Sequence, residues 1–239
     1  MIRESLFEIA ENSPLSENVR RLRLRGDTSA ITVPGQFVNL RIDGVFLRRP
    51  LSVCDCEEDT LTVIYRITGE GTELLSKKSS GTLNVLTGLG NGFDLSLAGS
   101  SPLLIGGGMG FTPLYYLAKK LERPTVILGF NTESEILYEK EFRALGAEVI
   151  IATADGSRGI KGFVTDAMES LSYSYFYSCG PEAMFRAICG CAKTDGEFSF
   201  EARMGCGFGA CMGCSCKTVT GSKRICRDGP VLKRSELLW

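Results

Sequence analysis

The chain has 239 residues, ten of them cysteine and none histidine, and a formal net charge of −1. A charge near zero without a basic run argues against a protein that binds nucleic acid through its phosphates, and no apolar run is long enough to span a membrane. Without histidine, Ser-His and Cys-His nucleophile pairs are excluded, so we expect a cofactor to carry any chemistry.

The cysteines are the unusual part of the composition. The N-terminus is charged and lacks the apolar core of a signal peptide, which predicts a cytoplasmic protein. Cytoplasmic thiols stay reduced, so metal ligation explains ten cysteines better than a disulfide framework does.

The first third of the chain, residues 1–98, consists of short alternating segments separated by Gly, Pro, Asn and Asp turns. These segments are typical of β-strands and cover residues 4–10, 19–25, 36–42, 61–67 and 82–86. Five or six strands with no helical period predict a small antiparallel β-barrel.

One stretch of this barrel suits a flavin. Arg49 is followed by Pro50, Leu51 and Ser52 at the end of a strand. A guanidinium there would bind a pyrophosphate bidentately, while the Ser52 hydroxyl would meet the polar edge of the isoalloxazine. Alone, such an arginine is more often a solvated surface residue.

A second stretch supports the first. In Ile64-Tyr65-Arg66, the Tyr65 ring is expected to stack on the flavin or its ribityl chain. Gly71 and Thr72 begin a short helix ending at Lys77, whose N-terminus would attract a phosphate. A plain turn explains Gly71 and Thr72 alone, but the two stretches together predict an FAD-binding barrel.

Residues 99–195 begin with a strand, a glycine-rich turn and a helix. The strand covers Leu103 to Ile105, and the turn contains Gly106, Gly107, Gly108, Gly110 and Pro113. Such a turn brings backbone N–H groups to a pyrophosphate at the start of the helix. The sequence differs from G-x-G-x-x-G by a proline in third place, which suits the first helical turn.

Further alternating elements follow this turn. Strands are expected over 125–130, 148–152 and 173–178, and helices over 139–145, 163–171 and 182–192. Their alternation predicts a parallel sheet, in an α/β Rossmann-like domain that binds NAD. Cys179 follows the last of these strands, where a role beside the nicotinamide and simple packing are equally compatible with the sequence.

The residues after the second strand of this domain bear on the choice of nucleotide. Glu133 and Glu135 lie there, without a neighbouring Arg or Lys in the segment 130–135. A 2′-phosphate would need cationic partners, so the sequence favours NAD over NADP.

The last part, residues 196–239, contains the densest cysteine motif. Cys206, Cys211 and Cys214 follow the order C-x4-C-x2-C, the plant-type spacing for a [2Fe–2S] cluster. Interspersed glycines let the loop bring backbone N–H groups near the sulfurs. A structural zinc site would more often have two separate C-x2-C knuckles, so zinc is the weaker alternative.

The fourth ligand has two candidates. Segments 217–220 and 224–226 are expected to form a hairpin that turns at Gly221-Ser222 and returns Cys226 to the other three cysteines. Cys216 is also within reach. Cys226 is favoured because Cys214 and Cys216 are too close in sequence to hold opposite sides of a cluster.

Taken in chain order, these motifs resemble those of a known family. The resemblance rests on residues 49–52, 64–66 with 71–72, 106–113, 179–181 and 201–206. On them the chain resembles the ferredoxin–NADP reductase superfamily and, within it, the electron-transfer subunits of dihydroorotate dehydrogenase B. The resemblance covers nearly the whole chain, and its most specific part is the four-cysteine tail.

The resemblance implies an α+β multidomain oxidoreductase subunit. It implies FAD on the two barrel stretches, NAD at the glycine-rich turn, and [2Fe–2S] on Cys206, Cys211, Cys214 and Cys226. Electrons would pass from the FMN of a dihydroorotate-oxidising catalytic subunit through the cluster and FAD to NAD⁺, in pyrimidine (UMP) biosynthesis. The implied assembly is a heterotetramer with two copies of each subunit.

Two other functions remain open from the sequence. Relatives without that catalytic subunit serve other complexes, such as sulfide dehydrogenase or NADH-dependent ferredoxin reductase, so the chain is alternatively a subunit of one of these. A redox-inert interaction module that binds zinc is the third interpretation.

Overall fold

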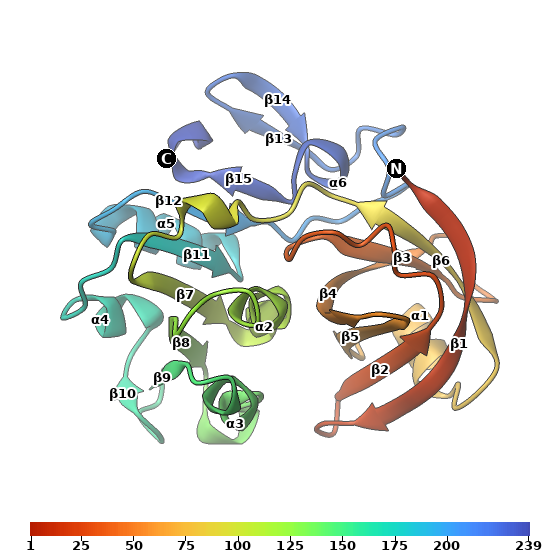
Figure 1. Ribbon diagram of the computed structural model, residues 1–239, viewed down its shortest axis with the longest axis horizontal. Coiled ribbons are helices and arrows are strands. Elements are labelled where there is room, and N and C mark those ends of the chain that lie inside the picture. The colour runs from red at the N-terminus through yellow and green to blue at the C-terminus, as the bar shows by residue number, and fades with distance from the viewer.

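The computed structural model describes all residues, 1–239, and consists of a closed barrel, a seven-stranded sheet and a two-stranded hairpin (Figure 1). The barrel and the large sheet lie side by side, and the C-terminal segment runs across the top of both. No helix of the structure is long and apolar enough to cross a lipid bilayer.

The barrel is antiparallel and closes in the order β1-β2-β5-β4-β3-β6, which confirms the predicted architecture. Its interior is filled by alternate side chains such as Phe7, Leu22 and Val63, all fully buried. The strands are β1 (Arg3–Pro14), β2 (Val19–Arg25), β3 (Phe37–Arg41), β4 (Arg49–Glu57), β5 (Thr60–Arg66) and β6 (Thr82–Leu89), with the helix α1 (Glu70–Ser76) after β5.

Two details of the barrel differ from the sequence-based expectation. Strand β4 was not among the expected strands, and Arg49 lies at its start rather than at the end of a strand. Helix α1 begins at Glu70, two positions before Thr72. Strand β4 was not predicted because its polar, cysteine-containing sequence does not alternate. In the structure, a β-bulge between Val53 and Asp55 interrupts the pairing of β4 with β5.

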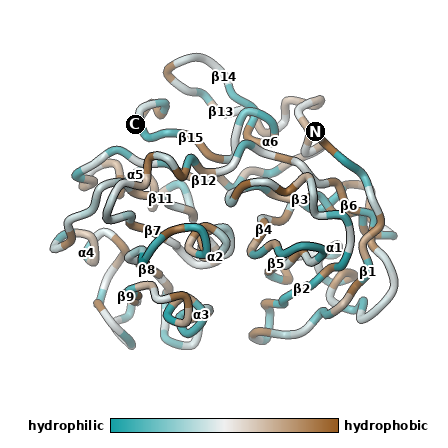
Figure 2. Tube along the Cα trace, viewed as in Figure 1, coloured by the Kyte–Doolittle hydropathy of each residue, from teal (hydrophilic) through white to brown (hydrophobic).

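The large sheet has the order β10-β9-β8-β7-β11-β12-β15 and is parallel except for β15, which pairs antiparallel with β12. The buried strand β7 is hydrophobic in its central part (Figure 2). The strands are β7 (Pro102–Gly107), β8 (Thr125–Phe130), β9 (Glu148–Thr153), β10 (Ile160–Lys161), β11 (Tyr175–Cys179), β12 (Gly196–Ser199) and β15 (Val231–Lys233).

Helices cover both faces of this sheet, as an α/β domain requires. Leu114 and Phe142 bring two helices onto one face, and Val164 and Phe185 bring two others onto the opposite face. The first pair is α2 (Phe111–Ala118) and α3 (Glu139–Ala144), and the second is α4 (Val164–Met168) and α5 (Glu182–Cys191). Short 3₁₀ turns lie at Leu95–Leu97, Gly108–Gly110, Glu133–Glu135 and Arg234–Glu236.

The C-terminal segment leaves the sheet after β12 and returns to it as β15. Between them lie the cysteine loop (residues 204–214), the hairpin β13 (Ser215–Thr218) and β14 (Gly221–Arg224), and the helix α6 (Ile225–Asp228). The hairpin turns at Val219-Thr220, because Thr218 pairs with Gly221, so the expected turn at Gly221-Ser222 was wrong. Cys226 therefore lies on α6 rather than at a strand end.

Candidate functional site

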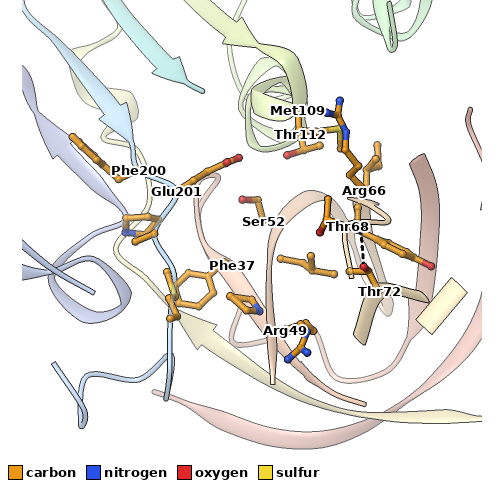
Figure 3. A pocket seen from close by; sticks show the side chains of 17 residues that line it. Phe37, Arg49, Ser52, Arg66, Thr68, Thr72, Met109, Thr112, Phe200 and Glu201 are labelled. Atoms are coloured by element: carbon orange, nitrogen blue, oxygen red, sulfur yellow. Dashed lines mark hydrogen bonds between the residues drawn. The ribbon is translucent and has the colours of Figure 1, made fainter. Parts of the chain in front are cut away.

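Two cavities lie where the barrel, the large sheet and the C-terminal segment meet. The first, here called the barrel pocket, has a volume of about 350 Å³ (Figure 3). All the predicted flavin residues except Gly71 line it: Arg49, Pro50, Leu51, Ser52, Ile64, Tyr65, Arg66 and Thr72. The two sequence stretches chosen for the flavin therefore converge on one cavity.

Arg49 and the start of α1 form a cationic end of the barrel pocket. The Arg49 Nη1 donates to the Leu47 carbonyl at 2.6 Å, which fixes the guanidinium. It rests directly against Gly71, where an added Cβ would lie only 2.3 Å from the Arg49 Nε. The Thr72 hydroxyl accepts from the Thr68 backbone N–H at 2.9 Å and orders the approach to the helix. This end fits a pyrophosphate.

Tyr65 lies between the barrel pocket and the barrel core. Its side chain points into the barrel core, is 2% exposed, and donates its hydroxyl proton to the Asn12 Oδ1 at 3.1 Å. Burial raises the pKa of this phenol. The Tyr65 ring therefore packs into the barrel core although the residue also lines the barrel pocket, and its stacking on the flavin or its ribityl chain stays a prediction.

The opposite wall of the barrel pocket was not found from the sequence. It comes from Phe37 of the barrel and from the C-terminal segment, through Phe200, Ala202, Met204 and Pro230. Met204 lies two positions before Cys206, so the barrel pocket and the cysteine loop adjoin. Aromatic residues immediately before the cysteine motif were the only sequence signal for this wall.

The second cavity, the sheet pocket, has a volume of about 590 Å³ and lies at the carboxyl ends of β7, β8 and β11, where open α/β sheets bind ligands. Gly107 and Gly108 line it directly, together with Asn131, Phe163 and Pro181. The glycine-rich turn predicted for a dinucleotide therefore opens onto a cavity of suitable size.

The other residues predicted for this turn support it from behind. A Cβ on Gly110 would lie 1.9 Å from the Cys179 carbonyl oxygen, so only glycine allows the turn to approach β11. Gly106 packs close to Leu128, and Pro113 is buried in the first turn of α2. Cys179 itself is 1% exposed and does not line the pocket, which favours its packing role.

The two pockets share a border. Arg66, Met109 and Glu201 line both of them, and Figure 3 shows these three side chains around the opening with Ser52 and Thr112. The protein surrounding Glu201 raises the pKa of its carboxyl, and Arg66 lowers it in part. Molecules bound in the two pockets would therefore meet beside Arg66 and Glu201.

Of the two acidic residues expected to select NAD, Glu135 lines the sheet pocket and Glu133 does not. Glu135 accepts from the Asn131 backbone N–H at 3.2 Å. Glu133 pairs with Arg158 at 3.5 Å, and Arg158 also binds Glu139 at 2.9 Å. The sequence did not reveal Arg158 as a neighbour, but two carboxylates already neutralise it.

Backbone N–H groups of the cysteine loop point at its sulfurs. The Cys206 Sγ accepts from Ala210 at 3.2 Å and from Cys211 at 3.4 Å, while the Cys211 Sγ accepts from Cys206 at 3.4 Å. Burial opposes ionisation of Cys206, but the N–H groups of Cys211, Phe208 and Ala210 lower its pKa to about 6. Such N–H donors stabilise cluster-bound thiolates.

The other two favoured ligands form a second pair. The Cys226 N–H donates to the Cys214 Sγ at 3.4 Å, and both residues are buried. Burial and the neighbouring Cys214 raise the pKa of Cys226 to about 12, so ionisation of this thiol needs the positive charge of a metal. The Cys216 thiol instead donates to the Lys217 carbonyl at 3.5 Å.

The four favoured cysteines are joined as two pairs. Within each pair, Cys206–Cys211 and Cys214–Cys226, a backbone N–H of one cysteine donates to the sulfur of the other. A zinc site needs four ligands around one point. Two thiolate pairs suit a cluster of two irons better.

Family models match two parts of the chain. Residues 201–238 match the iron-sulfur cluster binding domain of dihydroorotate dehydrogenase B, and residues 104–190 match the oxidoreductase NAD-binding domain. The first match contains the cysteine loop, the hairpin and α6, and the second contains the sheet pocket's glycine-rich turn.

Curated relatives are similar over the full length. The chain is 42% identical to the dihydroorotate dehydrogenase B (NAD(+)) electron transfer subunit of Geobacillus sp. (strain WCH70), with 100% of each chain covered. It is 40% identical to that of Fusobacterium nucleatum, with 96% of each covered.

Solved structures show the same fold. A structure of the NADH-dependent reduced ferredoxin-NADP oxidoreductase, described for flavin-based electron bifurcation, superimposes with a TM-score of 0.87 at 29% identity, covering 98% of this chain and 90% of that one. A ferredoxin NADP⁺ reductase from Neisseria gonorrhoeae with bound FAD and NADP gives 0.68 at 16% identity, covering 82% and 99%. With these likenesses and its full-length relatives, the chain belongs to the family of dihydroorotate dehydrogenase B (NAD⁺) electron transfer subunits.

Proposed function

We propose that this chain is the electron-transfer subunit of an NAD-dependent dihydroorotate dehydrogenase. NAD(H) would bind in the sheet pocket, FAD in the barrel pocket, and a [2Fe–2S] cluster at Cys206, Cys211, Cys214 and Cys226. The observation that carries the proposal is the continuity of the three sites. The pockets share Arg66, Met109 and Glu201, and the barrel pocket reaches Met204, the first residue of the cysteine loop.

Bound FAD would supply the change between paired and single electrons, since a flavin can accept a hydride from a nicotinamide and pass single electrons to a cluster. The chain supplies binding and placement. Arg49 and the start of α1 would hold the pyrophosphate, and Ser52 would meet the polar edge of the isoalloxazine. Phe200 and Met204 would keep water from the path between the flavin and the cysteine loop.

The proposed partner is a catalytic subunit that holds FMN and oxidises dihydroorotate, in an assembly of two copies of each subunit. The cysteine loop supports such a partner, because Phe208 and Met212 are 46% and 59% exposed beside Cys206 and Cys211. Exposed apolar side chains of this kind are typical of docking surfaces. We also propose that the chain acts in the cytoplasm, where its ten cysteines would stay reduced.

We also keep the three-unit organisation as a proposal, with an FAD-binding barrel over 1–98, an NAD-binding domain over 99–195 and a cluster domain over 196–239. The boundary at residue 196 does not separate two independent bodies. Strands β12 and β15 belong to the sheet, so the cluster domain is an excursion from it rather than a separate body.

A second candidate is a subunit of another NADH-dependent ferredoxin or acceptor reductase complex. The 29% identity and nearly complete coverage shared with the NADH-dependent reduced ferredoxin-NADP oxidoreductase favour it. Both candidates use the same three sites in this chain and differ in the partner that receives or donates electrons at the cysteine loop.

Anaerobic addition of NADH to the purified chain should bleach its flavin and cluster absorption bands, and NADPH should do so far less efficiently. We expect a preference of roughly tenfold in kcat/KM with a dye acceptor, corresponding to about 1.4 kcal/mol. Glu135 would repel a 2′-phosphate, and Arg158 is already paired. Glu135→Gln should reduce the preference for NADH over NADPH. Equal use of both nucleotides would contradict the assignment, and a colourless chain containing zinc would contradict the function.

Arg49→Ala should make the chain lose FAD during desalting. The substitution removes a charge-assisted contact worth about 1.5–3 kcal/mol, and flavin absorbance per protein measures the result. Arg41→Ala is the matched control, because Arg41 is an exposed arginine of β3 in the same barrel and does not line the pocket. Full FAD retention by Arg49→Ala would move the pyrophosphate site to another cation, such as Arg66.

A further inference from the structure

Helix α2 connects the two pockets with the barrel core along one of its faces. Thr112, Tyr116 and Lys119 are spaced four and three residues apart, so they lie on the same side of the helix. Thr112 lines the barrel pocket, and Tyr116 is 5% exposed and packs into the hydrophobic core of the barrel. Lys119 follows at the end of the helix. The helix that begins after the Gly108–Gly110 turn is therefore seated on the barrel along its length.

The end of α2 binds two carboxylates of strand β4. The Lys119 Nζ lies 2.8 Å from each Asp55 carboxylate oxygen and 2.7 Å from the Glu57 Oε1. The Lys119 and Asp55 side chains are only 23% and 19% exposed, so solvent screens this pair less than a surface ion pair. Burial alone would lower the pKa of Lys119, but its bonds to Asp55 and Glu57 raise it, so the ammonium stays charged.

Strand β4 is shaped for this contact. Its β-bulge lies between Val53 and Asp55, and a bulge redirects the side chains that follow it. Val53 packs inside the barrel, whereas Cys54 is fully buried with Leu114 of α2 in the core that covers the large sheet. The same strand carries Arg49 and Ser52 of the barrel pocket at its other end.

Helix α2 and strand β4 thus face each other across the boundary between the large sheet and the barrel. Each of them touches the barrel pocket at one end and carries one partner of the Lys119–Asp55 pair towards the other. We propose that Lys119 is a positioning residue for hydride transfer, because its bonds to Asp55 and Glu57 hold the Gly108–Gly110 turn in register with the barrel pocket. The inference rests on the proposed function, in which NADH at this turn reduces the flavin. Lys119 lines neither pocket, so it acts through α2.

The test is the anaerobic rate of flavin reduction by NADH, followed by stopped flow. Lys119→Met should lower the rate at saturating NADH by roughly tenfold, because small displacements of reacting groups are costly. The apparent Kd for NADH should change by less than about threefold, since the nucleotide contacts remain. Lys119→Arg should restore the rate. Lys140→Met is the matched control, because Lys140 is an exposed lysine of α3 without an ion pair in the structure.

A second measurement does not depend on activity. In Lys119→Met without nucleotide, amide hydrogen exchange should become faster in residues 106–118 and 49–57 and remain unchanged in β8 and β9. Asp55→Asn should reproduce both effects in part, because Lys119 keeps its bond to Glu57, and the double variant should be no worse than Lys119→Met, which already removes both bonds. Hydrogen exchange and the Asp55→Asn variant therefore still test the proposal if Lys119→Met retains too little FAD for a rate measurement.

The outcomes separate the two proposals. Equal rates of flavin reduction in wild type and in the Lys119 and Asp55 variants would overturn the positioning role alone. An equal loss of rate in Lys140→Met, or a loss that Lys119→Arg does not restore, would also overturn it. A wild-type flavin that NADH does not reduce would overturn the proposed function and this inference with it.

Discussion

Cys226→Ser is expected to remove most of the iron and acid-labile sulfide from the purified chain. Cys226 lies on α6 with its N–H directed at the Cys214 sulfur, so the two form one thiolate pair of the proposed cluster. A serine there leaves one iron without a thiolate in a buried place, where no other cysteine sulfur is paired with Cys214. The visible absorption of the cluster should fall with the iron content, while the flavin bands remain.

Cys216→Ser and Cys54→Ser are the matched controls. Both remove a free thiol, but Cys216 faces the Lys217 carbonyl and Cys54 is buried at the boundary between the barrel and α2. Each variant should keep its iron and sulfide. Loss of the cluster in Cys216→Ser together with its retention in Cys226→Ser would show that Cys216 is the fourth ligand.

The second large effect concerns the division of labour between subunits. The isolated chain should pass electrons from NADH to a dye but form no orotate from dihydroorotate. That oxidation takes a proton and a hydride from adjacent carbons, which requires a base beside an accessible flavin face. The chain has no histidine, and the only carboxylate lining the barrel pocket, Glu201, borders the opening that the nicotinamide would fill.

Adding an FMN-bearing catalytic subunit should restore NAD-coupled turnover of dihydroorotate. Phe208→Asp should weaken this coupling without changing the dye reaction, because it places a charge on the exposed side of the cysteine loop. Val219→Asp is the control, since Val219 is also an exposed apolar residue, at the tip of the β13–β14 hairpin. Orotate formed by the purified chain alone would refute the proposed division of labour.

Local sequence patterns were sufficient for the architecture of the barrel and the sheet. Alternating segments predicted the closed barrel, and the glycine-rich turn predicted a strand, a turn and a helix that the structure contains at β7 and α2. These features depend on neighbours within a few residues. The cysteine spacing is similarly local, and the structure arranges those cysteines in pairs.

Features that depend on distant segments could not be predicted. The orientation of Tyr65 is decided by which face of β5 closes the barrel, and a short strand does not encode that choice. Phe37 and Phe200 line one pocket although they are far apart in sequence. The Lys119–Asp55 pair could not be predicted either, because its two residues are far apart in sequence. The β-bulge that orients Asp55 is also the reason that β4 was not predicted.

The path of the C-terminal segment has a consequence for how the protein matures. The segment that carries the cysteines leaves the large sheet at β12 and is returned to it by β15. Both ends are therefore anchored by backbone pairing that needs no metal, and the entropy of closing this loop is already offset by the sheet. We therefore expect that iron and sulfide can be inserted after the sheet has formed, which would make cluster assembly and polypeptide folding separable steps.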